Sequence, residues 1–167
     1  DDQDDTYLDH IHRSNVLTNE HEQSLENTLD LFEFTALGDR RYAEYLGERN
    51  GLIVPGEDGE LLEFRIFESH KYRDSAGALL IDVYSQATYL DLKTARIIDP
   101  HTTDPETAQQ HATLALQNTE WQVGNVDYAG IRTLTFGNYT NPYAYLKRIA
   151  REFELELLFD VTTDGQR

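Results

Sequence analysis

Two short turn sequences divide residues 51–87 into apolar runs of strand length. Gly56–Glu60 contains Asp58-Gly59, a strong hairpin signal, and Asp74–Gly77 separates the next two runs. Strands joined by such short turns pair with their neighbours in antiparallel fashion. The pattern therefore predicts an antiparallel sheet or small barrel, with strands at Gly51–Pro55, Leu61–Tyr72 and Ala78–Ala87.

The residues before this region give a less regular pattern. Leu25–Leu37 alternates well and predicts a strand with both faces partly covered. Tyr7–His12 alternates imperfectly and predicts a short strand, whereas the polar stretch Asn19–Gln23 predicts a break. We expect a single helical turn at Ala43–Leu46 and a mobile acidic start at Asp1–Asp5. The first half is therefore expected to be mainly β.

The pattern changes near residue 95. Thr103–Glu106 has the signature of a helix start with proline in the first turn, and Asn141-Pro142 caps a second helix. Apolar or buried-type residues then recur at helical spacing on one face of each segment. They are Ala108, His111, Ala112 and Ala115 (up to about Leu116) in the first helix, and Leu146, Ile149, Ala150 and Phe153 in the second.

Three further segments of the second half are expected to be strands. They are Thr119–Val126, Ile131–Phe136 and Leu155–Val161. The order helix, strand, strand, helix, strand describes an α/β segment unlike the first half. We therefore predict an α+β fold with a β-rich domain at residues 1–95 and an α/β domain at residues 96–167, truncated at its end.

Composition and charge exclude several classes of protein. The chain has no cysteine, which removes disulfide scaffolds, thiolate zinc sites and cysteine nucleophiles. The formal net charge is −17 and the basic residues are scattered, so we expect no sequence-specific nucleic-acid binding. The chain has no run of about 18 apolar residues, so we expect no membrane span. No signal peptide is visible, and we expect the chain to be a fragment.

Histidines give the first candidates for a metal site. His10 and His12 would share one face of a strand, and a His-x-His pair can chelate a metal. Local spacing fixes no third ligand, because His21 lies beyond a polar break. The remaining histidines, His70, His101 and His111, are isolated. Packing or surface roles are therefore favoured, and we predict no metal-binding residue and no cofactor.

Carboxylates and short motifs give no catalytic group. Glu57, Asp58 and Glu60 cluster on a turn, where carboxylates are usually solvated. The chain has no Gly-x-Ser-x-Gly elbow, phosphate loop, Gly-x-Gly-x-x-Gly or His-Glu-x-x-His sequence. Asn138-Tyr139-Thr140 fits a glycosylation sequon, but matches of three residues are common by chance. We predict no catalytic or cofactor-binding residue and no enzymatic activity in this segment.

Tyrosines flank the second expected helix. Tyr139, Tyr143 and Tyr145 could form an exposed aromatic patch, which would mark an interface. They could equally wedge the helix against a sheet. The sequence leaves both interpretations open.

Several segments together resemble a known family. Tyr89–Leu92 near a strand end, a helix after Pro100, and then Gln117–Gly124 follow the pattern of siphophage tail-associated proteins. Those proteins, also described as phage minor structural protein or prophage tail endopeptidase, carry a Gly-Thr-x-Trp-x-Val-Gly strand in their N-terminal region. Here Asn118 occupies the position where the family often has glycine.

Three more segments extend the resemblance. Asn141–Lys147 followed by Phe153–Leu157 resembles the family's helix and Glu-Leu strand. Leu61–Glu68 resembles its Phe-x-Ile-x-Glu strand. The likeness covers residues 25–167 and is strongest from residue 80 onward.

The resemblance implies a baseplate-hub-like fold, with a β-barrel-like hub domain followed by an inserted α/β domain. It implies a homotrimer at the phage tail tip, which closes the tail tube beneath distal tail protein, meets tape measure protein and opens for DNA ejection. Such a protein would be located in the virion or in a prophage-encoded equivalent. Endopeptidase, lysin or receptor-binding activity would lie downstream of this segment.

Two alternatives remain at this stage. One is a cell-wall hydrolase or peptidase, and the other is a receptor- or carbohydrate-binding module that uses exposed aromatic residues. For a trimer, the charge further predicts an acidic lumen that repels DNA, and assembly that strengthens with salt.

Overall fold

The computed structural model describes residues 7–24, 29–56, 59–162 and 167. The chain forms two compact units. The first contains the residues up to Thr88 and a short segment that begins at Asp160, and the second contains Tyr89–Phe159 and the C-terminal end. The predicted domain boundary between residues 95 and 96 falls inside the second unit. The division into domains that fold independently at residues 1–95 and 96–167 stays a prediction.

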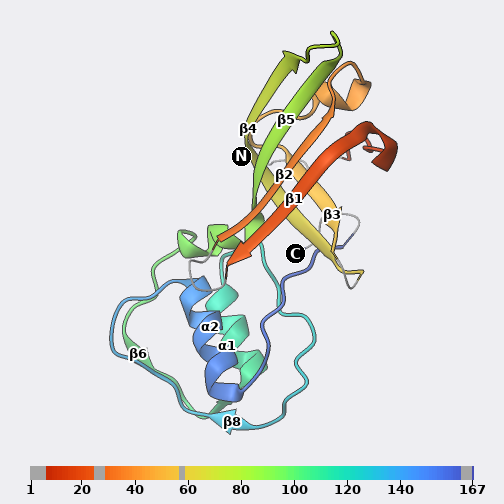
Figure 1. The fold of residues 1–167 in the computed structure, drawn as a ribbon. Helices are drawn as coiled ribbons and strands as arrows, with labels where there is room; N and C mark the ends of the chain where they lie inside the picture. The colour runs from red at the N-terminus through yellow and green to blue at the C-terminus, as the bar shows by residue number, and fades with distance from the viewer. Residues whose placement is uncertain (1–6, 25–28, 57–58, 163–166) are drawn as a thin grey trace. The chain divides into compact units, whose positions relative to one another are not determined.

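A curled, five-stranded antiparallel sheet dominates the first unit (Figure 1). The strand order is β1-β2-β5-β4-β3, so β1 and β3 form the two edges. The strands are β1 (Val16–Ser24), β2 (Leu29–Leu37), β3 (Gly51–Pro55), β4 (Leu61–Arg73) and β5 (Leu79–Ala87).

The strands expected from turn chemistry are confirmed. β3, β4 and β5 follow the predicted ranges to within a residue, and they pair as two consecutive hairpins. At the second turn, the Asp74 carboxylate accepts hydrogen bonds from the backbone N–H groups of Ala76 and Ala78, at 2.9 and 2.8 Å. Gly77 supplies the positive φ that closes this turn. In the turn between β3 and β4, Glu57 and Asp58 lie outside the described residues.

Two predictions near the N-terminus were wrong. Tyr7–His12 forms no strand and leads into a 3-10 turn, η1 (Arg13–Asn15). Asn19–Gln23 is no break, because it lies inside β1 and pairs with β2 in continuous register. An edge strand with exposed side chains needs no alternation of apolar residues. The polar sequence of β1 therefore gives no strand signal. The expected mobile start, Asp1–Asp5, lies outside the described residues.

The core of the first unit lies on one face of the sheet. η2 (Arg41–Glu44), two residues earlier than the helical turn expected at Ala43–Leu46, covers part of this face. The buried residues come from β2, β4, β5 and the η2 region, and they are Phe34, Ala36, Tyr42, Ala43, Leu46, Ile66, Ile81 and Val83. Each fully buried side chain of the larger kinds stabilises the fold by about 1.5–3 kcal/mol.

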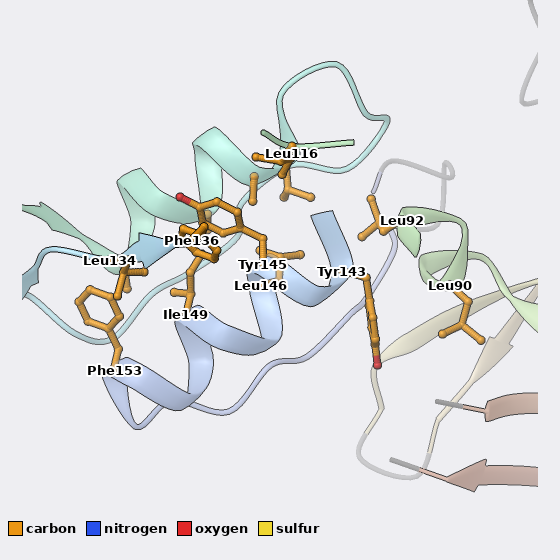
Figure 2. Packing of buried hydrophobic residues seen from close by; sticks show 14 residues of the cluster. Leu90, Leu92, Leu116, Leu134, Phe136, Tyr143, Tyr145, Leu146, Ile149 and Phe153 are labelled. Carbon is orange, nitrogen blue, oxygen red and sulfur yellow. The ribbon is translucent and has the colours of Figure 1, made fainter. Parts of the chain in front are cut away.

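Two helices supply most of the buried core of the second unit (Figures 1 and 2). They are α1 (Ala108–Leu116) and α2 (Pro142–Phe153). The expected apolar faces are confirmed, except that Ala150 is only half-buried. The small alanines of α1 let the larger side chains of α2 approach closely, and Figure 2 shows Leu146 and Ile149 among the packed residues.

The caps of the two helices differ in how well the sequence predicted them. Asn141 caps α2 as expected, because its side-chain oxygen accepts from the Ala144 N–H at 2.9 Å. The start predicted at Thr103–Glu106 was wrong. α1 begins at Ala108, after a capping box in which Thr107 and Gln110 exchange side-chain-to-backbone hydrogen bonds.

Most of the strands predicted in the second unit do not form, because most of their described residues make no hydrogen-bonded pairs with a neighbouring strand. Thr119–Val126 and Leu155–Val161 form no described strand, and Ile131–Phe136 is reduced to β8 (Ile131–Arg132) and β9 (Thr135–Phe136). β8 pairs with β7 (Glu106–Thr107), and β9 pairs with β6 (His101–Thr102).

The alternation that suggested these strands has a different cause. Leu155, Leu157 and Phe159 are half-buried against the helical core, and the residues between them are exposed. The segment is therefore extended because it packs against helices, without a neighbouring strand. The expectation of an α/β sheet in this half is corrected, while the chain as a whole is α+β. No helix among the described residues is long and apolar enough to cross a membrane.

Candidate interaction surfaces

The face of the sheet opposite the core, which we call the outer face, is acidic. The register places each side chain on one face or the other, since neighbouring residues alternate. A bulge at Phe67 shifts the pairing of β4 by one residue and brings Glu68 opposite Tyr84. The outer face carries Thr18, Glu20, Glu22, Leu31, Glu33, Thr35, Asp82, Tyr84, Gln86, Arg65, Glu68 and His70.

Some of these carboxylates have partners and some do not. Asp82 accepts hydrogen bonds from the hydroxyls of Thr35 and Tyr72, at 2.6 and 3.3 Å. Glu20 and Glu33 lie directly opposite each other on β1 and β2, an arrangement that destabilises a sheet. No hydrogen bond or ion pair with another described residue engages Glu20, Glu22 or Glu33. The carboxylates of the outer face that have no described partner are thus on β1 and on the neighbouring strand β2.

β1 also has an unpaired edge. Within the described parts of the chain, β1 pairs with β2 alone, and it stands at one end of the strand order. After an irregularity between Val16 and Thr18, the register runs unbroken to Ser24. In an antiparallel pair every second residue points its N–H and C=O away from the neighbouring strand. The outer side of β1 therefore presents a regular row of free backbone donors and acceptors.

A histidine–aspartate pair lies at the same edge, on the core face. His21 Nε2 is 2.7 Å from Asp30 Oδ1, and the Gln23 amide donates to Asp30 Oδ2 at 3.3 Å. Asp30 is only 2% exposed, and the His21 ring packs edge-on against Phe64 at 5.4 Å. Such a pair can serve as the base of a nucleophilic site. Among the described residues, however, no hydroxyl group bonds to the imidazole, and the contacts of the pair join β1 to β2.

The sequence did not predict this pair. The polar stretch Asn19–Gln23 predicts a break around His21, and no local motif marks Asp30 as buried. The useful signal was the polar alternation of β1, in which Asn19, His21 and Gln23 share one face of the strand. A carboxylate between leucines near the start of a strand, as Asp30 is in β2, also indicates a polar partner on the neighbouring strand.

The other histidines do not converge. His12 accepts from the Ser14 N–H at 3.3 Å and so caps η1, while His10 is exposed. His70 contacts Glu68 at 2.7 Å on the outer face. His101 and His111 both lie in the second unit, and each contacts a backbone carbonyl oxygen. No group of three potential metal ligands occurs among the residues described.

The three tyrosines around α2 separate into different environments. Tyr139 is 71% exposed, whereas Tyr143 and Tyr145 are buried. Tyr143 stacks in a group with Tyr89 and Phe159. The interpretation in which tyrosines wedge the helix is confirmed for Tyr143 and Tyr145. Only Tyr139, of the three, fits the alternative of an exposed aromatic patch.

Tyr145 is the most strongly perturbed ionisable group. Its ring stacks on Phe136 at 3.9 Å, as Figure 2 shows, and its hydroxyl is 3.3 Å from His101 Nε2. Burial, helped by the negative charge of Glu106, raises the pKa of Tyr145 to about 12. Arg148 lies over the Phe136 ring at 4.7 Å and partly opposes this effect. The group is a packed core residue that stays protonated at neutral pH.

The remaining candidates give no site. Glu60 is half-buried, while its neighbours Glu57 and Asp58 lie outside the described residues. Asn138 is exposed beside Thr140, which pairs with Ile98. A shallow, open hollow near the start of α1 is lined by Thr107, Gln109, Val126, Asp127, Tyr128 and Ala129.

Residues 95–166 match the family model described as the prophage endopeptidase tail domain. The resemblance to phage tail-associated proteins is confirmed. The matched region, under half of the chain, falls mostly in the helical second unit, and it supports a tail-associated structural role. No curated protein matches the chain.

The structure explains why Asn118 can occupy a position where the family often has glycine. Asn118 has φ +61°, and the preceding Gln117 has φ −53° and ψ 132°. The Thr119 N–H donates to the Leu116 carbonyl at 3.0 Å, which closes a type II turn at the end of α1. This turn requires a left-handed residue at its third position, and asparagine tolerates that conformation better than most residues. Asn118 therefore replaces glycine without a change of turn.

Proposed function

We propose that this chain is a structural component of the phage tail tip, where three copies form a hub that closes the tail tube. The hub joins distal tail protein to downstream adhesion or lysin domains, meets tape measure protein, and opens for DNA ejection. The match of residues 95–166 to a phage tail domain carries the proposal. The tip position and the trimer extend it beyond the match.

The charge distribution of the first unit supports this role. A ring that DNA must pass through is best lined by negative charge, because a basic lining would hold the phosphate backbone. The outer face supplies carboxylates at Glu20, Glu22 and Glu33 that pair with no other residue in the described part of the chain. In our proposal this face points into the lumen of the ring.

The assembly is tested by the mass of the chain in solution and by images of tails labelled through this chain. We expect a trimer, either alone or on addition of distal tail protein, and a label at the tail tip. A chain that stays monomeric in the presence of distal tail protein, or a label elsewhere on the tail, would count against the hub.

A second candidate function follows from the family description, which contains the word endopeptidase. We propose that this segment is not itself the enzyme, and that a lytic activity, where present, lies downstream. The support is the environment of the His21–Asp30 pair, which lacks a hydroxyl partner among the described residues. Incubation of the purified chain with host peptidoglycan and with peptide substrates tests this. Turnover that disappears in His21→Asn would establish the enzyme instead.

A further inference from the structure

The free edge of β1 has the properties of a binding site for another strand. β1 spans nine residues, and from Thr18 to Ser24 it is regular and carries no proline or glycine. Edge strands that stay free are usually short, carry charged side chains, or are broken by bulges and proline. Of these features, the regular part of β1 has only charges, Glu20 and Glu22, which repel an acidic strand and attract a basic one. The edge of β1 is instead long enough for an added strand to form several backbone hydrogen bonds.

The side chains on this edge select the occupant. An added strand would place its outer-face side chains directly beside Glu20 and Glu22, both exposed and both without an ionic partner among the described residues. Opposite charges in neighbouring strands stabilise a sheet, and like charges destabilise it. Since Glu33 already faces Glu20, a cation on the free side of β1 would also relieve an existing repulsion.

The same charges exclude a second copy of β1. If two β1 strands paired antiparallel about their centres at His21, Glu20 of each would face Glu22 of the other. Two pairs of like charges would then lie side by side, next to Glu33 of each copy. The edge is therefore unsuited to self-association by this strand.

We propose that β1 is a docking edge for an extended segment of a partner protein that carries lysine or arginine at alternate positions. The segment adds as a strand beside β1, its cations on the outer face next to Glu20 and Glu22. On the core face its uncharged side chains meet Asn19, His21 and Gln23, which are exposed and polar. Hydrogen bonds to the free backbone groups of β1 supply affinity, and the carboxylates of Glu20 and Glu22 supply specificity for a basic partner. The proposal does not depend on a trimer. In the proposed hub, cations beside Glu20 and Glu22 would offset only part of the net charge of −17, so the lumen would stay acidic with the partner bound.

The test uses the full chain and a capped peptide of strand length, with lysine at alternate positions and threonine between them. Two control peptides accompany it: one has glutamate in place of lysine, and the other keeps the lysines but has proline in place of threonine, so that it cannot pair as a strand. Binding is measured by calorimetry, and hydrogen exchange follows the β1 amides. We expect the lysine–threonine peptide alone to bind and to slow exchange at alternate residues of β1.

Matched variants of the chain separate this docking from general attraction. Glu20→Lys/Glu22→Lys should weaken binding of the lysine–threonine peptide about tenfold or more and should create binding of the glutamate peptide. Asp104→Lys/Glu156→Lys changes the net charge equally at exposed positions of the second unit and should have little effect.

Three results would overturn the proposal. They are equal binding of the proline peptide, an equal loss of binding in the Asp104/Glu156 variant, and slow exchange along β1 that depends on protein concentration without peptide. The last result would show that a second copy occupies the edge.

Discussion

At the scale of single residues, the clearest consequence of packing is the ionisation of Tyr145. Its pKa is raised from 10.0 to about 12 in the folded chain, so the folded state keeps a proton that the unfolded state loses above pH 10. Stability should therefore fall as pH rises from about 10 to about 12, by up to about 1.4 kcal/mol per pH unit. The measurement is urea unfolding at a series of alkaline pH values, followed by circular dichroism.

Replacement of the phenol isolates this contribution. Tyr145→Phe keeps the stack on Phe136 and should flatten the alkaline decline, at the loss of one long hydrogen bond to His101. Tyr139→Phe removes an exposed phenol and should leave the decline as in the original chain. An unchanged decline in Tyr145→Phe would show that another group causes it.

Asn118 gives a second prediction at the residue scale. Asn118→Gly should change the free energy of unfolding by less than about 0.5 kcal/mol, because glycine adopts the left-handed conformation freely. Asn118→Val should destabilise the second unit by about 1–2 kcal/mol. Fluorescence of Trp121, the only tryptophan and part of this unit's core, reports the unfolding. Gln117→Val is the control, since its negative φ suits an ordinary residue. An equal loss in that variant would contradict the turn argument.

At the scale of elements, the start of α1 is set by the Thr107–Gln110 capping box. Thr107→Ala should cost about 1 kcal/mol of stability, because a backbone N–H of the first turn loses its acceptor. Thr107→Ser keeps the hydroxyl and should remain close to the original stability. Thermal unfolding of the two variants, followed by helical circular dichroism, measures the difference. Equal stability of the alanine and serine variants would show that the hydroxyl of Thr107 does not stabilise the start of α1.

The elements also show what the sequence could predict. β3, β4 and β5 were predictable because local turn chemistry at Asp74–Gly77 specifies a hairpin without reference to the rest of the fold. β1 was not, because its polar residues are stabilised by pairing with β2, which is a tertiary property. Conversely, the alternation of residues 155–159 reports burial against helices and says nothing of a ladder. Alternation of apolar and polar residues indicates that one side of an extended segment is buried. Whether the segment is a β-strand depends on a neighbouring strand that pairs with its backbone.

The candidate surfaces were less predictable than the fold. The acidic row from Glu20 to Glu68 depends on strand order and on the bulge at Phe67, which no local pattern reveals. His21 and Asp30 meet only once β1 and β2 pair. For Tyr143 and Tyr145 the helical spacing placed both residues on α2, but their burial followed from what packs against the helix.

At the scale of the whole molecule, the net charge of −17 determines how copies of the chain meet. Protomers this acidic repel one another over distances of about 10 Å at moderate ionic strength, and salt screens that repulsion. The proposed trimer should therefore strengthen between about 50 mM and about 500 mM NaCl, as measured by sedimentation at several protein concentrations. Sucrose, which does not screen charge, is the control for effects on solvent alone.

The direction of this salt effect distinguishes two kinds of interface. Contacts made mainly of apolar side chains, such as the exposed Ile97 and Leu158 of the second unit, gain from screening because only repulsion is removed. Contacts made of ion pairs between copies would weaken instead. Dissociation on addition of NaCl would therefore mean that the scattered basic residues are concentrated at the subunit boundary. The acidic outer face would then serve to bind neighbouring copies, and its proposed place in a DNA-repelling lumen would be wrong.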